Sequence, residues 1–320
     1  MARLKDRLIG HDEVFDFLLP SLQGDGLALT LLFAGPSGIG KRATALALAQ
    51  ALLCERSSAA CGQCGSCQRV EQGVHESLLS LEPEGPMIKI DQAREVLEFL
   101  QLRRLGRARV VLIDQAQSLN PQAANSLLKI LEEPPEGTFI FLIAPSPSSV
   151  LPTLRSRSRV VQFRPLTDAE LKKIQTAPDW AVRAARGSVE KLRGLMESEE
   201  QETRQVSSQV LEAFLAEPEF LQGAGWRDFV KEKGAFPRIL GFWQGFVRDG
   251  LVLHARGPAF LMNPDQKNLL DRLSQVPRPA LEELSQRLLQ LEKDTVFHRD
   301  PALAVEELWV TWRRPREKMA

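Results

Sequence analysis

The sequence predicts an α/β domain in the first half of the chain, with a parallel sheet flanked by helices, and a second half that is helical throughout. Short apolar runs alternate with helical patterns between residues 4 and 163, which is typical of a parallel sheet covered on both faces. A glycine-rich loop, GPSGIGKR at residues 35–42, lies between an apolar run and an Ala/Leu-rich helix, the order that a phosphate-binding loop requires. After Phe163 the strand patterns end, so we expect helices in the remainder.

Apolar runs predict five strands, of which four are clear and one is placed just before Asp91. The expected strands cover residues 29–34, 87–90, 110–113, 139–144 and 160–163. Helical spacing predicts helices at residues 41–53, 91–102 and 120–131. Asn120 followed by Pro121 marks a helix start, and Pro134 marks a stop.

The second half divides into a small helical unit and a larger helical domain. The small unit, residues 165–203, begins with Thr167 and Glu170, a pair that predicts a helix cap. In the larger domain, Trp309 and Trp312 lie one helical turn apart and are expected to anchor a core or an interface. The chain is therefore expected to comprise an α/β domain over residues 1–164, the small unit, and a helical domain over residues 204–320.

Bulk composition limits the classes of protein that remain. No apolar stretch is long enough to cross a bilayer, and MARLKDRLIG at the start shows no secretory signal. We therefore expect a cytoplasmic protein without a membrane partner. Lysine plus arginine equals aspartate plus glutamate at 41 each, so the whole chain offers no general attraction to nucleic acid. A contact with DNA would have to come from a local patch or from partner proteins.

All four cysteines lie close together with the spacing C-x6-C-x2-C-x2-C, as Cys54, Cys61, Cys64 and Cys67. Four thiolates suit a tetrahedral zinc ion, and two CxxC steps are typical of ligand spacing. Disulfides are the alternative, which the absence of a secretory signal disfavours. We expect a structural zinc ion in a surface insertion, contributing on the order of 10 kcal/mol to local folding. His75 is expected to be a surface or capping residue rather than a ligand.

The glycine-rich loop lacks one chemical group of a working phosphate loop. In such a loop the glycine N–H groups surround the phosphates, the lysine reaches their oxygens and a following hydroxyl ligates magnesium. The chain keeps Gly35, Gly38, Gly40 and Lys41. It has Arg42 in place of the hydroxyl, and a guanidinium cannot ligate a cation. Asp114 follows the strand at 110–113, where a magnesium-binding carboxylate is expected, so the loop is expected to bind phosphate weakly and to hydrolyse poorly.

Several further motifs occur in the order found in the clamp-loader branch of the AAA+ proteins. They are IDQAREV at 90–96, LLKILEEPP at 127–135, TLRSRS at 153–158 and the cysteine cluster. The first half of the chain therefore resembles this family, and in particular the subunits of the bacterial DNA polymerase III clamp loader. The resemblance implies that the three parts are an AAA+ domain, a lid domain and a collar through which five subunits form a ring.

Three arginines, Arg155, Arg157 and Arg159, alternate with other residues just before the last strand. An extended segment would place all three on one face, whereas a solvated charged loop is the ordinary alternative. The resemblance implies that Arg157 is an arginine finger that enters the ATP site of an adjacent subunit. Ser158 stands where the family's motif has a cysteine.

The resemblance also identifies positions where hydrolysing members carry catalytic side chains. Gln115 stands where many AAA+ ATPases carry a glutamate, and Ala144 with Pro145 stands where they carry threonine or asparagine. Glu190, in the GSVEK stretch, stands where active members place an arginine, and its charge would repel a terminal phosphate. We therefore expect no independent ATPase activity, while the retained Lys41 leaves ATP or ADP binding open.

The expected function is that of a non-hydrolysing subunit of the clamp loader, within the DNA polymerase holoenzyme, that assists ATP-dependent loading of the sliding clamp on primed DNA. The implied partners are the gamma/tau ATPase and delta subunits, with the clamp and primer-template DNA contacted through the complex. An active ATPase subunit with an atypical loop is the alternative. A zinc-dependent DNA-binding module is weaker, because the cysteine motif is short and the net charge is zero.

Overall fold

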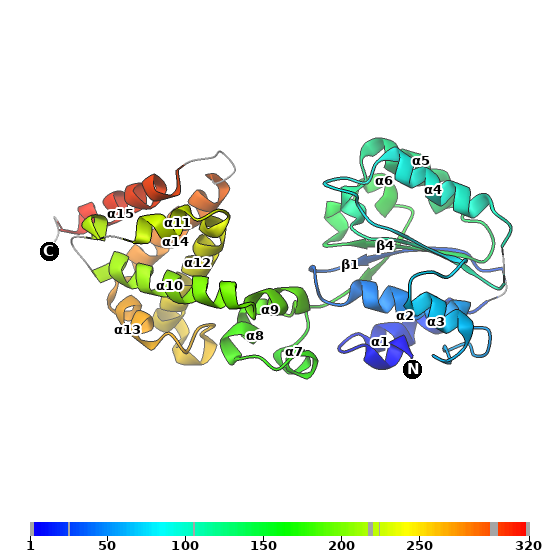
Figure 1. Cartoon of the computed structure of the whole chain (residues 1–320), viewed down its shortest axis with the longest axis horizontal. Helices are drawn as coiled ribbons and strands as arrows, with labels where there is room; N and C mark the ends of the chain where they lie inside the picture. Colours follow the sequence, from blue (N-terminus) through cyan, green and yellow to red (C-terminus); the bar gives the residue numbers. More distant parts are fainter. Residues whose placement is uncertain are drawn as a thin grey trace. The chain divides into compact units, whose positions relative to one another are not determined.

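A computed structural model describes residues 3–24, 26–104, 106–216, 220–223, 225–294 and 300–317. The contacts within it group the chain into two compact units (Figure 1). The first unit comprises Met1–Thr176 and Arg186–Lys191, and the second comprises Ala177–Ala185 and Leu192–Ala320. The division into three domains at residues 164 and 203 stays a prediction.

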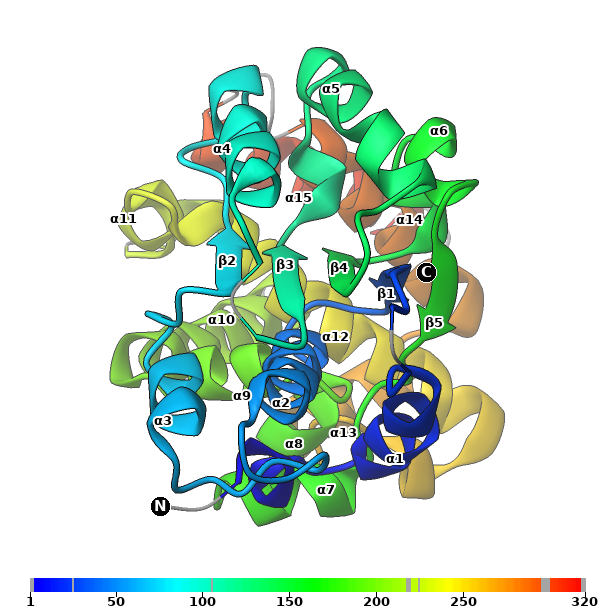
Figure 2. The same cartoon turned by 90° about the vertical axis from the view of Figure 1, so that its right-hand side faces the viewer.

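The first unit is built on one sheet of five parallel strands. Their order is β2-β3-β4-β1-β5, so the strand that precedes the glycine loop lies between β4 and β5 (Figure 2). This parallel α/β fold confirms the sequence prediction. The strands are β1 Leu29–Ala34, β2 Leu78–Leu81, β3 Arg109–Ile113, β4 Thr138–Ala144 and β5 Arg159–Gln162.

One expected strand was placed wrongly. Residues 87–90 contribute a single bridge, between Ile88 and Leu119, and Ile90 already begins α4. The fifth strand of the sheet is instead β2, which lies earlier in the sequence and pairs with β3 at the edge of the sheet. Its sequence, LLSL, is short and is interrupted by Ser80, so it lacks the continuous apolar run that marks the central strands.

Helices cover both faces of the sheet. Helices α1, α2 and α3 lie on one face, and α4, α5 and α6 lie on the other (Figure 1). Strand β1 shows how the two cores alternate, because Leu31 and Phe33 belong to the first core and Leu32 to the second. The helices are α1 Asp12–Ser21, α2 Lys41–Leu53, α3 Gly65–Glu71, α4 Ile90–Gln101, α5 Pro121–Glu132, α6 Pro152–Arg155 and α7 Asp168–Ile174.

The second unit is helical in its described residues. Trp243 is fully buried at its centre, and its indole N–H donates to the carbonyl of Ser207 at 2.9 Å. Trp309 and Trp312 are also buried in this core, where the indole of Trp312 donates to Ala280. The helices are α8 Asp179–Ala185, α10 Ser198–Ala216, α11 Trp226–Lys231, α12 Ala235–Arg256, α13 Lys267–Gln275, α14 Arg278–Asp294 and α15 Pro301–Glu317, and α9 Val189–Leu195 has residues in both units.

Short 3-10 helices complete the fold, and none of the described helices is long and apolar enough to span a bilayer. These 3-10 helices are Leu4–Arg7, Ala116–Ser118, Pro147–Ser149, Phe220–Gln222 and Pro258–Phe260.

The predicted cap at Thr167 is confirmed and is reinforced by a charge. The Thr167 hydroxyl accepts from the N–H of Glu170, whose carboxylate accepts from the N–H of Thr167 at 2.7 Å, which is a capping box. Arg164 also donates to the same carboxylate through both terminal nitrogens. The hydrogen bond from Arg164 is the main reason that the pKa of Glu170 falls to about 2.

This lowered pKa makes the stability of the fold depend on pH. Since the usual pKa of glutamate is 4.5, the charged Glu170 stabilises the fold fully above that pH and progressively less as the pH falls toward 2. Glu170→Gln keeps an oxygen for the cap but removes the charge. The wild type should therefore be more stable than this variant at about pH 6, with the difference shrinking by about pH 3, as measured by urea unfolding. A difference that does not vary with pH would contradict the assignment.

Candidate functional site

A cavity of about 410 Å³ lies where the strands of the first unit end, within the size range of small-molecule sites. Because all five strands are parallel, the loops after them meet at one edge of the sheet. The lining comes from the loop after β1, the start of α2, the residues after β3, the end of β4, and Glu190. The lining residues are Ser37, Gly38, Gly40, Lys41, Arg42, Asp114, Gln115, Gln117, Ile143, Ala144, Pro145 and Glu190.

The glycines of the loop are required by its shape. Gly38 and Gly40 have φ angles of 72° and 104°, in the region that other residues rarely adopt. At Gly35 a Cβ atom would lie 2.6 Å from the carbonyl oxygen of Phe163, so only glycine fits between the loop and the residue after β5. These positions support the interpretation of residues 35–42 as a phosphate-binding loop.

Lys41 is buried and points back at its own loop. Its ammonium group donates to the carbonyl oxygens of Gly35 and Pro36, both at 2.6 Å. Burial lowers the pKa of Lys41, and the nearby charges of Asp114 and Glu190 oppose this shift. The lysine that would bind phosphate is therefore held against its own loop by neutral acceptors.

Arg42 contacts two carboxylates at the mouth of the same cavity. Its Nη1 atom lies 3.1 Å from Oδ2 of Asp114, and the same nitrogen pairs with Glu82. Burial disfavours its charge, but the hydrogen bonds to Glu82 and Asp114 outweigh this effect and raise the pKa of Arg42. The guanidinium is therefore a permanent cation in the site.

The second oxygen of Asp114 is also engaged. Oδ1 accepts from the N–H of Gln115 at 2.9 Å, and Gln115 adopts a left-handed conformation with φ of 52°. The hydroxyl that would hold magnesium is thus replaced by the guanidinium of Arg42. The carboxylate that would hold it, Asp114, is already paired with this guanidinium. These residues do not fit a magnesium ion, because a cation in this position would be repelled by Arg42.

The departures from a hydrolysing site that the sequence indicated all line one cavity. Gln115, Ala144 with Pro145, and Glu190 surround the same space as Arg42. Glu190 lies in the first turn of α9, whose first residue, Val189, donates through its N–H to the carbonyl of Gly38 at 2.8 Å. The structure therefore places these residues together, although they are far apart in the sequence.

Glu82 is the member of this site that sequence analysis missed. It directly follows β2, just as Asp114 directly follows β3, and these strands are parallel neighbours. Two such residues lie side by side at the carboxyl edge of the sheet. The available signal was the LLSL run before Glu82, which was not identified as a strand.

Arg157 lies elsewhere on the first unit and does not line this cavity. The segment before it is not extended, because Pro152–Arg155 forms the short helix α6 and Arg159 begins β5. The condition for one shared face, an extended segment through all three arginines, is therefore not met. The Nε atom of Arg157 donates to Glu132 at 3.0 Å, and its Nη1 donates to the carbonyl of Thr153. Glu132, at the end of α5, is 59% exposed, so this ion pair lies at the surface.

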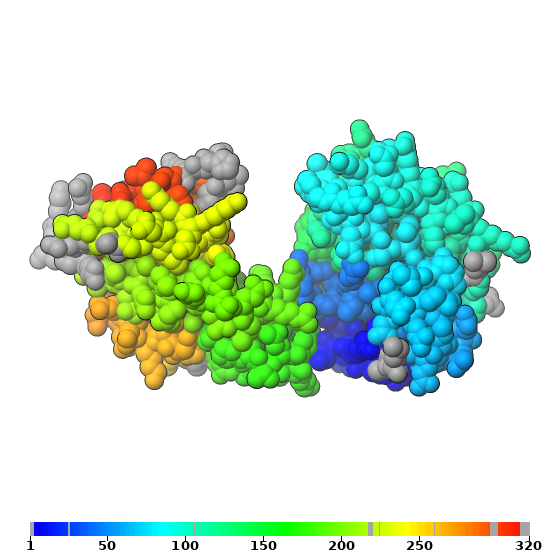
Figure 3. Space-filling model, viewed as in Figure 1, coloured from blue at the N-terminus to red at the C-terminus, as the bar shows by residue number. Residues whose placement is uncertain are grey.

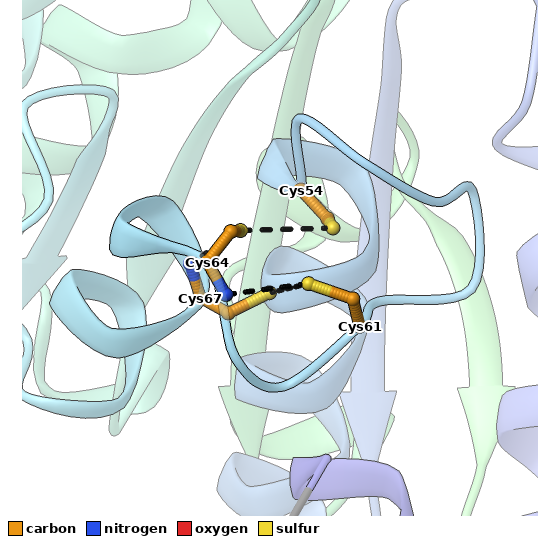
Figure 4. A group of neighbouring side chains, drawn as sticks. All are labelled: Cys54, Cys61, Cys64 and Cys67. Carbon is orange, nitrogen blue, oxygen red and sulfur yellow. Dashed lines mark hydrogen bonds between the residues drawn. The ribbon is translucent and has the colours of Figure 1, made fainter. Parts of the chain in front are cut away.

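The four cysteine side chains converge at one point (Figure 4). Their sulfur atoms all lie within 4.8 Å of one another, and two pairs, Cys54 with Cys64 and Cys61 with Cys67, are 3.9 Å apart. Zinc–sulfur bonds of about 2.3 Å in a tetrahedron place the sulfurs about 3.8 Å apart. The thiols are free, so the disulfide alternative does not apply to this structure. The number, the chemistry and the spacing of the four sulfur donors therefore fit a closed metal site.

Backbone N–H groups already point at these sulfurs. The N–H of Cys64 donates to the sulfur of Cys61 at 3.3 Å, and that of Cys67 donates to the sulfur of Cys64. Backbone hydrogen bonds, that from Gln63 first, lower the pKa of Cys61 to about 6, whereas burial raises the pKa of Cys67 to about 12. Such N–H contacts stabilise the thiolate forms that a metal ion requires.

The cysteine segment is hydrogen-bonded to the end of α2. The buried side chain of Gln50 donates to the carbonyl of Cys67, and Ser66 donates to the carbonyl of Leu53 at 2.6 Å.

His75 is buried rather than at the surface. Its Nε2 lies 2.8 Å from the hydroxyl oxygen of Ser66, and its Nδ1 accepts from the N–H of Ser77. Both imidazole nitrogens are therefore used, and His75 is not a ligand. The segment forms part of the outside of the unit, in light blue in the space-filling view (Figure 3).

Comparison with known proteins gives matches over the first half of the chain. Residues 10–167 match the family described as "DNA polymerase III, delta subunit". DNA polymerase III subunit delta' of Pseudomonas aeruginosa is 44% identical over 48% of this chain and 46% of its own. The delta' subunit of Escherichia coli is 39% identical over 47% of each chain, and subunit tau of the same organism is 33% identical over 47% of this chain and 24% of its own. The chain thus spans about half the length of the curated delta' relatives it matches.

Matches to solved structures have low sequence identity. A DNA polymerase III gamma subunit-related protein from Thermotoga maritima is 17% identical, with a TM-score of 0.49 over 94% of this chain and 98% of its own.

The matched stretch contains the sheet, the glycine loop, the cysteine cluster and Arg157. Its similarity is found with delta' and tau/gamma subunits alike, and among the relatives reported above it is higher with delta'. Residues 10–167 of the chain are therefore similar to the delta' subunits of DNA polymerase III.

Proposed function

We propose that the chain is a non-hydrolysing subunit of the clamp loader, which supplies Arg157 to the ATP site of a neighbouring subunit. The observation that carries the first part is the pairing of Arg42 with Asp114 and Glu82 in the cavity. Phosphoryl transfer in P-loop proteins depends on a magnesium ion held by a loop hydroxyl and a strand-end carboxylate. Here neither group is available to a metal ion.

Other residues that line the cavity also support the absence of hydrolysis. Gln115 cannot accept the proton of an attacking water, and neither Ala144 nor Pro145 has a side-chain group to orient one. Glu190 adds negative charge where a terminal phosphate would approach. An active ATPase is the alternative, and only the retained Lys41 and Asp114 favour it.

The position of Arg157 supports a role in trans. Its side chain is 31% exposed, and its ion pair with Glu132 is at the surface, where such pairs are worth about 0–1 kcal/mol. A phosphate on a neighbouring subunit could therefore replace Glu132 at low cost. Because the transition state of phosphoryl transfer spreads negative charge over its oxygens, an arginine in trans typically accelerates hydrolysis by about 10³ to 10⁵.

The similarity to delta' and tau/gamma subunits supports the partners of this proposal. We propose that the chain assembles with the gamma/tau ATPase and delta subunits in the cytoplasm, through the helical second unit as a collar. Sliding clamp and primer-template DNA would then be contacted through the complex, in ATP-dependent clamp loading.

We further propose that Cys54, Cys61, Cys64 and Cys67 hold one zinc ion with a structural role. The closed set of four sulfurs leaves no open position for chemistry. Since three of these cysteines are buried in the core beneath α2, the metal would hold the far end of that helix in place.

ATP turnover by the purified chain tests the missing activity. The chain alone should not hydrolyse ATP above background, with or without magnesium, because Arg42 replaces the loop hydroxyl and pairs with Asp114. Steady-state phosphate release is the measurement, with the gamma/tau ATPase alone as the positive control. Magnesium-dependent turnover by the lone chain would favour the alternative of an active subunit.

Arg157→Ala tests the role in trans. The variant should fold and assemble, but hydrolysis at the adjoining ATP site should slow by about 10³-fold or more, seen as a slow fraction in single-turnover hydrolysis by the complex. Arg155→Ala, two residues away and also exposed, is the matched control and should behave as wild type. Glu132→Gln removes the ion pair but keeps Arg157 and should also retain activity. Unchanged hydrolysis and clamp loading in Arg157→Ala would refute the role.

Removal of the metal tests the cysteine site. The chain should contain about one zinc ion per molecule, and Cys64→Ser or a strong chelator should release it and lower the melting temperature. Gln63→Ala, an exposed position between two of the cysteines, should change neither. Purified chain that is fully stable with no bound metal would contradict a structural role for zinc.

A further inference from the structure

The cavity at the phosphate loop carries its own fixed cation. In P-loop proteins a magnesium ion bridges the phosphate oxygens and a strand-end carboxylate. In this chain the guanidinium of Arg42 lies beside that carboxylate, 3.1 Å from Oδ2 of Asp114, and also contacts Glu82. A positive charge is thus present where the magnesium ion would lie, but it belongs to the protein.

We infer that Arg42 takes the place of the magnesium ion, and that the cavity binds a nucleoside diphosphate without a divalent cation. Both carboxylates contact the same nitrogen of Arg42, Nη1, so its Nε and Nη2 donors remain for a ligand as far as the described residues go. A guanidinium presents its N–H donors in a fork that matches phosphate oxygens. The Arg42 side chain lines the cavity and is 40% exposed.

The charges of the cavity favour a short phosphate chain. Lys41 and Arg42 are positive, Asp114 and Glu190 are negative, and all four line the same space. Arg42 is shared between Asp114 and Glu82, while Lys41 remains to attract phosphate and Glu190 to repel a third phosphate group. Lys41 now contacts only neutral carbonyls, at 2.6 Å, and a charged phosphate oxygen would be the stronger partner.

This inference rests on the proposed function and adds the ligand of the cavity. One experiment can contradict the ligand without contradicting the role of Arg157. Binding is measured on the chain alone, whereas the role of Arg157 is measured on the assembled complex. A subunit that bound ADP but supplied no arginine in trans, or the reverse, would remove only one of them.

Calorimetric titration of the full chain with ADP, once with magnesium and once with EDTA, tests this inference. The dissociation constant should differ by less than about twofold between the two buffers, because no divalent cation takes part. Arg42→Ser restores the hydroxyl of a working loop and frees Asp114. That variant should bind ADP about tenfold or more tightly with magnesium than with EDTA.

Two further variants serve as controls for this titration. Arg42→Lys retains a positive charge and should retain binding that is independent of magnesium, so a folding defect in Arg42→Ser would not end the test. Arg94→Ser removes an ion-paired surface arginine outside the cavity and should match the wild type. Strict dependence of wild-type binding on magnesium would overturn the inference. So would the absence of ADP binding in both buffers.

Discussion

The parallel pairing of all five strands is the constraint on which the candidate site depends. It brings the carboxyl ends of β1, β2, β3 and β4 to one edge, where the glycine loop, Glu82, Asp114 and Pro145 follow them. Because β1 lies between β4 and β5, the loop after it faces both the residues of β4 and Phe163 after β5. The cavity exists only through this strand order.

Within that cavity, a single arginine changes the chemistry of a familiar loop. The loop keeps the glycines and the lysine that shape a phosphate site, yet the guanidinium of Arg42 pairs with both nearby carboxylates. The architecture of a phosphate-binding loop is therefore retained, while a guanidinium pairs with the carboxylate that would bind a metal ion.

Helix α2 joins the two chemically distinctive parts of the first unit. Its first residues are Lys41 and Arg42, and Cys54 follows its last residue. At 13 residues the helix is about 20 Å long. Gln50 and Ser66 bind the cysteine segment to its far end, so a metal ion there would fix the helix that presents the cations to the cavity.

Local features were predictable from the sequence, and long-range pairings were not. The loop, α2, the cap at Thr167 and the cysteine cluster each depend on spacing within one short segment, which the sequence shows directly. The tertiary structure alone decided that Arg42 meets Asp114, 72 residues away, and that Arg157 meets Glu132, 25 residues away. These contacts depend on the order in which strands pair, and side-chain periodicity reports which residues are buried without reporting which strand lies beside which.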